Sequence, residues 1–104
     1  MRLRRDMAAQ AAAINASGPE RLGPITVMER ATASGTTLTF HYRIDSAETF
    51  DSDGRRQLER NLRRQACSNV EMVLAIRDGG KFVHSYSNRS GRRVAEVAID
   101  RCSG

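Results

Sequence analysis

The chain has little of several things that small proteins use to build a core or a site. Its 104 residues contain no tryptophan, two tyrosines, three phenylalanines, two prolines and two cysteines. No stretch approaches the roughly 20 apolar residues that a membrane-spanning helix requires, so we expect no transmembrane segment. Zinc-finger spacing, an aromatic platform for stacking bases and an RNA-binding signature are all missing. Nucleic acid is therefore a less favoured partner.

The charge is strongly one-sided. The formal net charge is +5 and the isoelectric point is about 10.2, which suits an acidic partner such as nucleic acid, anionic lipid or an acidic protein. Sixteen of the seventeen basic residues are arginine, and Lys81 is the only lysine. Such a skew is typical of a GC-rich genome, so the charge by itself does not specify the partner.

The two cysteines are the most informative residues. Cys67 falls where a helical pattern ends, and Cys102 closes the last strand-like stretch. We expect a disulfide bond between them, which would stabilise a lean core by roughly 4 kcal/mol and would place the protein outside the cytoplasm. The alternative is two separate reduced cysteines in a cytoplasmic protein, because free cysteine is itself a common buried residue.

Periodicity and breaks divide the chain into helices and strands. An alanine-rich helical pattern over residues 3–16 stops at Gly18, which suits a helix C-cap. Strict alternation over 36–44, preceded by a second two-residue period from Ile25, predicts a β-hairpin. Helical patterns follow over 55–66 and from Val70, where residues 68–71 have the spacing of a capping box. A second hairpin is predicted from 81–86 and 93–100.

The resulting order, α-β-β-α-α-β-β, predicts an α+β fold. We expect a four-stranded antiparallel sheet made from two β-hairpins, with helices packed on one face. The chain is predicted to be a single domain over 1–104, near the lower end of the sizes that bury an adequate core. Residues 1–18 would form an N-terminal helix or stalk, and residues 25–102 would form the α+β core.

No catalytic or metal-binding constellation emerges from the sequence. Alternation turns His41 outward and His84 inward, so the two histidines are predicted not to meet. Residues 51–54 resemble the start of a calcium-binding loop, but Arg55 and Arg56 follow directly and repel a cation. We therefore interpret the aspartates of that segment as helix caps. We predict that the protein is not an enzyme and binds no metal and no cofactor.

Arginines on the middle helix are the best candidates for a binding surface. Arg56, Arg60 and Arg63, with Arg64 nearby, would grip phosphates or carboxylates. The more favoured interpretation is a solvated helix face on which Glu59 pairs with Arg63. An exposed edge strand is the other candidate, either for a partner strand or for a homodimer formed through the sheet edge.

Several segments together resemble a group of small bacterial envelope proteins, often with an N-terminal membrane anchor before one soluble domain. The segments are Asn15…Pro19…Leu22, the strand Leu38–Asp45, a helix reaching Cys67, the stretch Gly79–Tyr86 and the terminal Cys102. The resemblance implies export and the disulfide bond, and it implies no activity. It also implies that contact with a membrane would depend on an anchor preceding Met1.

Two functional hypotheses follow. The first is a non-enzymatic, disulfide-stabilised protein-binding module of the bacterial cell envelope, located in the periplasm or otherwise outside the cytoplasm. The alternative is a small basic cytoplasmic protein that binds nucleic acid or inhibits a nucleic-acid-bound enzyme. The alternative predicts reduced cysteines and binding that weakens steeply with salt.

Overall fold

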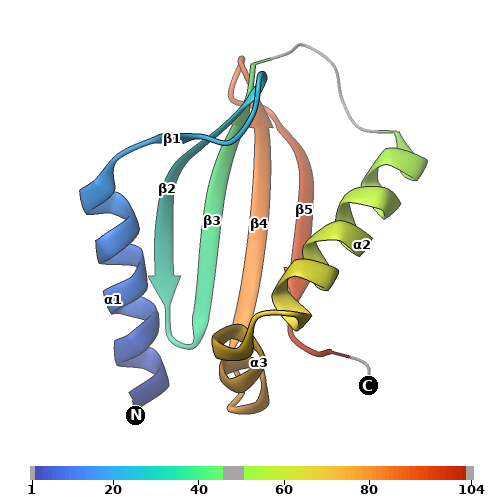
Figure 1. Ribbon diagram of the computed structural model, residues 1–104. Coiled ribbons are helices and arrows are strands. Elements are labelled where there is room, and N and C mark those ends of the chain that lie inside the picture. Colours follow the sequence, from blue (N-terminus) through green and yellow to red (C-terminus); the bar gives the residue numbers. More distant parts are fainter. Residues whose placement is uncertain (1, 46–50, 103–104) are drawn as a thin grey trace.

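The computed structural model of the chain describes residues 2–45 and 51–102. Within these residues, three helices lie on one face of a five-stranded sheet (Figure 1). The elements, in chain order, are α1 (Arg2–Ser17), β1 (Glu20–Arg21), β2 (Thr26–Ser34), β3 (Thr37–Ile44), α2 (Ser52–Cys67), α3 (Val70–Arg77), β4 (Lys81–Asn88) and β5 (Arg93–Ile99). None of the described helices has the length and apolar character needed to span a membrane.

The predicted α+β class and the placement of the helices on one face are confirmed, but the sheet differs from the prediction in two respects. A short first strand, β1, adds a fifth strand by pairing antiparallel with β2. In addition, the central strands β3 and β4 are parallel: Thr37 lies opposite Lys81, and Ile44 lies opposite Asn88. The sheet is therefore mixed, in the order β1-β2-β3-β4-β5.

The length of α2 explains the parallel pair. Its 16 residues span about 24 Å at 1.5 Å per residue, and the eight residues of β3 span about 26 Å. The helix therefore carries the chain back along the whole length of β3, so that β4 starts at the same end of the sheet as β3. Alternation within a strand specifies its two faces but not the direction of its neighbour, which is why the sequence pattern predicted two hairpins instead.

The helix-covered face of the sheet holds two clusters of buried side chains. The larger cluster, called the α2 core, joins α2 to β3, β4 and β5; its buried members are Tyr42, Ile44, Leu62, Ala66, Tyr86, Ala95, Val97 and Ile99. The smaller cluster, called the α1 core, joins α1 to β2, β3 and β4; its buried members are Leu3, Met7, Ala11, Ala31, Leu38 and Phe82. The N-terminal helix thus packs on the sheet.

The predicted disulfide bond is present. Cys67, the last residue of α2, is bonded to Cys102, and their Cα atoms are 5.7 Å apart. The Asp51 side chain caps α2 by accepting a hydrogen bond from the backbone of Gly54, as expected. The capping box predicted at 68–71 is displaced by one residue: Asn69 is the N-cap of α3, and Ser68 ends α2.

One edge of the sheet is covered by a side chain of α1. β1 pairs with β2 only as far as Met28, and no other strand of the described residues pairs with the rest of that edge of β2. Asn15 covers this edge at Ala31, because its Nδ2 donates to the Ala31 carbonyl (2.9 Å) and its Oδ1 accepts from the Ala31 backbone N–H (2.8 Å). A partner strand pairing there would have to displace the Asn15 amide.

Candidate functional site

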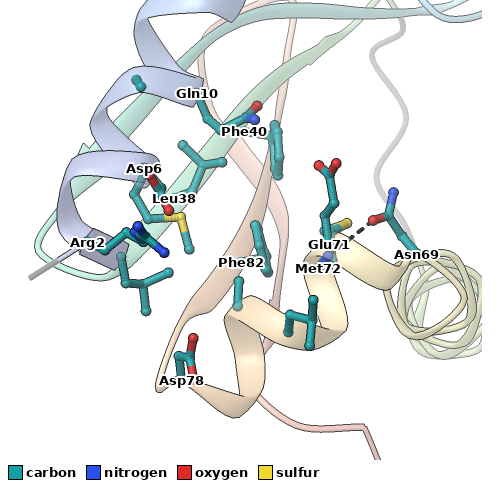
Figure 2. A pocket seen from close by; sticks show the side chains of 15 residues that line it. Arg2, Asp6, Gln10, Leu38, Phe40, Asn69, Glu71, Met72, Asp78 and Phe82 are labelled. Atoms are coloured by element: carbon teal, nitrogen blue, oxygen red, sulfur yellow. Dashed lines mark hydrogen bonds between the residues drawn. The ribbon is translucent and has the colours of Figure 1, made fainter.

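An apolar groove lies between α1 and α3, with the sheet as its floor (Figure 2). Its volume is about 600 Å³, in the range of sites that bury a ligand or a few large side chains. The lining side chains come from both helices and from β3 and β4: Arg2, Leu3, Asp6, Met7, Ala9, Gln10, Leu38, Phe40, Asn69, Glu71, Met72, Leu74, Ala75, Asp78 and Phe82.

The floor of the groove is aromatic and aliphatic. Leu38 and Phe40 project from β3, and Phe82 projects from β4. Leu38 and Phe82 are buried, whereas Phe40 is half-buried. The rings of Phe40 and Phe82 are stacked, with centroids 6.4 Å apart and planes inclined by 15°. The alternation that the sequence predicted for residues 36–44 puts these side chains on the helix-covered face, but it did not reveal that helices would leave them partly open.

The wall formed by α3 is apolar on both of its sides. Met72 and Ile76 pack against the two cores, yet no residue of this helix is buried. Val70 is 72% exposed and Leu74 is 52% exposed. Leu74 lines the groove and also a second hollow of about 210 Å³ beside the disulfide bond. A helix with apolar side chains on more than one side is normally covered on each of those sides, and α3 is not.

Three features hold α3 in place. The disulfide bond fixes the end of α2 directly before it, and the Asn69 side chain accepts a hydrogen bond from the Met72 backbone at its first turn. At its other end, Gly80 leaves no room for a side chain, since a Cβ there would lie 2.7 Å from the Ala75 carbonyl oxygen and 3.1 Å from the Met7 Cε. The groove is therefore built on a constrained scaffold.

Polar side chains surround the apolar floor. Arg2, Asp6 and Gln10 line the groove from α1, and Glu71 and Asp78 line it from the opposite side, at the two ends of α3. Figure 2 shows Glu71 extending from α3 beside the aromatic floor, opposite Gln10. All five residues are exposed. Asp6, Glu71 and Asp78 form no ion pair within the described part of the chain.

A buried polar pair lies between the two cores. The Tyr42 hydroxyl is 2.7 Å from His84 Nδ1, and the His84 ring stacks on Phe40 with centroids 5.0 Å apart. Burial lowers the pKa of His84 to about 4, so the imidazole is neutral near pH 7. Burial, with a smaller effect of Tyr86, raises the pKa of Tyr42. Neither His84 nor Tyr42 lines the groove, so the pair belongs to the core.

His41 lies on the opposite face of the sheet, where its Nε2 is 2.9 Å from the Thr32 hydroxyl. Partial burial, followed by the charges of Arg30 and Arg93, lowers its pKa. The two histidines therefore do not meet, as alternation predicted. In the described ranges, no group of three histidine, cysteine or acidic side chains is placed to hold a metal ion.

The four arginines predicted as a partner-binding face lie along the outer side of α2: Arg56, Arg60, Arg63 and Arg64. Most of their side-chain hydrogen bonds lie within α2, and one reaches the C-terminal segment. Arg63 is 3.4 Å from the Glu59 carboxylate, as the solvated-face interpretation predicted, and it donates to the Arg101 carbonyl. Arg56 pairs with Asp53 at 2.9 Å. None of the four lines the groove, and a role for them in binding stays a prediction.

Sequence reasoning identified neither the groove nor its rim. The available signal was α3 itself, because residues 70–76 place apolar side chains on more than one side of a short helix. That pattern fits complete burial equally well. Whether α3 is fully buried or borders an open groove depends on the distance between α1 and α3, which is set by the sheet beneath them.

Comparison with known proteins adds information on the fold alone. No family model matches the chain, and no curated protein matches its sequence. A crystal structure of a candidate secreted protein from Pseudomonas aeruginosa is similar over 95% of this chain and 89% of its own, with a TM-score of 0.82 and 16% identity.

Two pilotins of type II secretion systems are also similar. AspS from Vibrio cholerae matches 94% of this chain and 88% of its own, with a TM-score of 0.71 and 19% identity. EpsS from Vibrio vulnificus matches 94% of this chain and 87% of its own, with a TM-score of 0.78 and 14% identity. The fold of this chain is therefore one that small bacterial proteins, secretion pilotins among them, also adopt.

Proposed function

We propose that the protein is a non-enzymatic, extracytoplasmic module of the bacterial envelope that binds a helical segment of another protein in the groove between α1 and α3. The observation that carries the proposal is α3, whose apolar side chains remain exposed beside an aromatic floor. Contiguous exposed apolar surface of this kind is typical of interaction sites.

The groove favours a helix over an extended strand. Its lining comes from helices and from strands whose backbone groups are already paired within the sheet. An occupant must therefore satisfy its own backbone hydrogen bonds, as a helix does. Strand addition instead needs an open sheet edge, and Asn15 covers the backbone of Ala31 on one edge. An amphipathic helix laid into an apolar groove is a recurring mode of recognition.

The disulfide bond supports the extracytoplasmic location. A structural disulfide persists in oxidising compartments and is rare in the cytosol, and both cysteines of this chain are in the bond. The alternative of a basic cytoplasmic protein predicts two reduced cysteines, so it is less well supported. The likeness to two secretion-system pilotins and a candidate secreted protein supports an envelope role in the same direction.

Site-specific photo-crosslinking in the native host tests the proposal. A photoreactive amino acid would replace Leu74, which lines the groove, or Ala98, which is exposed on a strand away from it. We expect one discrete adduct from position 74, on a segment that forms a helix in the partner, and none from position 98. Equal labelling from both positions, or no adduct from position 74, would overturn the assignment of the groove.

A further inference from the structure

The charge around the groove is opposite in sign to that of the whole chain. The chain carries a formal net charge of +5. Among the residues that line the groove, however, three are carboxylates (Asp6, Glu71 and Asp78) and one is a guanidinium (Arg2), so the lining has two negative charges in excess. The other arginines at the start of α1, Arg4 and Arg5, do not line it.

The groove carboxylates differ from most other acids of the described residues in their partners. Elsewhere, five acids pair with arginines, for example Glu59 with Arg63. Three further acids in the described part of the chain form no ion pair: Glu20, Asp51 and Asp100. Within the described residues, Asp6 forms no such pair, even though Arg2 is only one helical turn away on the same helix. Three charges that the fold leaves unpaired beside an apolar floor are available to a ligand.

We infer that the groove selects an amphipathic helix whose apolar face is bordered by lysine or arginine. This inference rests on the proposed function and specifies the chemistry of its partner. Basic side chains along both edges of the helix would lie against Asp6 on one wall and against Glu71 and Asp78 on the other. Arg2 lines the groove on the Asp6 side and opposes such a partner directly, so the excess of negative charge lies on the side of Glu71 and Asp78. The positive charges away from the groove are screened beyond about 8 Å at physiological salt.

The same charges decide against a fatty acid or an anionic phospholipid. The floor would accept an acyl chain, but a negatively charged head group would lie beside three unpaired carboxylates. The head group and these carboxylates would repel each other, and the apolar contact of the acyl chain would have to outweigh that repulsion. An acidic partner, which the net charge of the whole chain suggested, is disfavoured at the groove for the same reason.

A series of three designed peptides tests the inference on the full chain. Each peptide is an amphipathic helix of about 18 residues, long enough to be partly helical in water, with the same leucine and phenylalanine face. The edge positions carry lysine, glutamine or glutamate. We expect the lysine peptide to bind on the order of tenfold more tightly than the glutamine peptide at about 0.15 M salt, since each exposed ion pair adds only modestly to affinity and several would form together. The glutamate peptide should bind most weakly.

Two variants separate the groove charges from the total charge. In Asp6→Asn/Glu71→Gln/Asp78→Asn, the advantage of the lysine peptide over the glutamine peptide should disappear. In the matched control Glu59→Gln/Glu96→Gln/Asp100→Asn, which changes the net charge equally but away from the groove, the advantage should persist.

The possible results distinguish the inference from the function on which it rests. Equal affinity for all three peptides, with binding lost in Leu74→Gln, would overturn the basic-edge inference and leave the helix-binding function intact. Absence of binding by every peptide, or binding unaffected by Leu74→Gln, would overturn both. Direct binding of free oleate to the protein that is tighter than that of every peptide and is lost in Leu74→Gln would assign the groove to a lipid and would likewise overturn both.

Discussion

The two halves of the helix-covered sheet face both consist of aliphatic and aromatic side chains, but the helices cover them to different extents. Under α2 the core is closed: Leu62 and Ala66 are buried against β5, and the outer side of the helix carries arginines. Beside α3 the face stays open, with Phe40 half-buried and Leu74 about half exposed. A chain with so few aromatics thus leaves Phe40 and Leu74 partly accessible beside the groove, and this contrast is the reason for proposing the open half as the binding surface.

Of the changes to the closed half, removing the disulfide bond should lower the free energy of unfolding most. The bond joins residues 35 positions apart, for which the loop-entropy model predicts a loss of about 4 kcal/mol in the free energy of unfolding. Cys67→Ser/Cys102→Ser should show this loss in urea denaturation. A loss below about 1 kcal/mol would mean that the α2 core alone fixes the end of the helix.

A pair of leucine truncations contrasts the two halves directly. Leu62→Ala removes a side chain that is 8% exposed and should cost about 3 kcal/mol, the middle of the range for buried leucines. Leu74→Ala removes one that is 52% exposed and should cost less than about 0.5 kcal/mol. Denaturation of both variants in parallel checks the pair, and equal losses would show that α3 is as well packed as α2.

The buried histidine at the boundary between the halves should make stability depend on pH. Burial lowers the pKa of His84 from 6.5 to about 4, so between these values the unfolded chain binds a proton that the folded chain does not. The free energy of unfolding should therefore fall as the pH drops from about 6.5 to about 4, by at most about 3 kcal/mol, and this contribution should level off at lower pH.

Comparison with variants isolates the contribution of His84 from that of the carboxylates. In His84→Phe, the loss of stability between about pH 7 and about pH 4.5 should be clearly smaller than in the unsubstituted chain. His41→Gln, on the exposed face, should retain most of the loss. If both variants lose stability equally with pH, the acid sensitivity comes from other groups.

The sequence carried enough information for the local features of both halves. Alternation over 36–44 turns His41 outward and, with the pattern of β4, turns His84 inward, and Gly18 ends α1 with a φ of 79° that suits glycine. Cys67 and Cys102 were informative because there are no other cysteines to compete for either of them. Each of these features depends on neighbours in the chain or on residue type alone.

What escaped prediction depends on how elements are placed relative to one another. The parallel pairing of β3 and β4 follows from the length of α2, and β1 consists of two residues, too short to show any period. The hydrogen bonds between Asn15 and Ala31 join residues sixteen positions apart. The groove likewise exists because α1 and α3 sit apart on the sheet, which no pattern within either helix encodes.

A smaller prediction concerns the covered edge of the open half. Asn15→Ala removes both hydrogen bonds to the Ala31 backbone, which should lower the free energy of unfolding by about 1–2 kcal/mol. Amide exchange of Ala31 should accelerate more than that of Met28, whose edge β1 covers. Unchanged exchange at Ala31 would show that other contacts protect this edge.

The most direct test of the central claim compares one substitution on each surface for its effect on the partner identified by crosslinking. Leu74→Gln removes apolar surface from the groove without changing the charge, whereas Arg56→Glu/Arg60→Glu/Arg63→Glu reverses the face of α2. Affinity for that partner should fall on the order of tenfold or more in the first variant, since burying a leucine contributes about 1.5–3 kcal/mol, and should change little in the second. Loss of affinity only in the arginine variant would contradict the account and place the binding surface on α2.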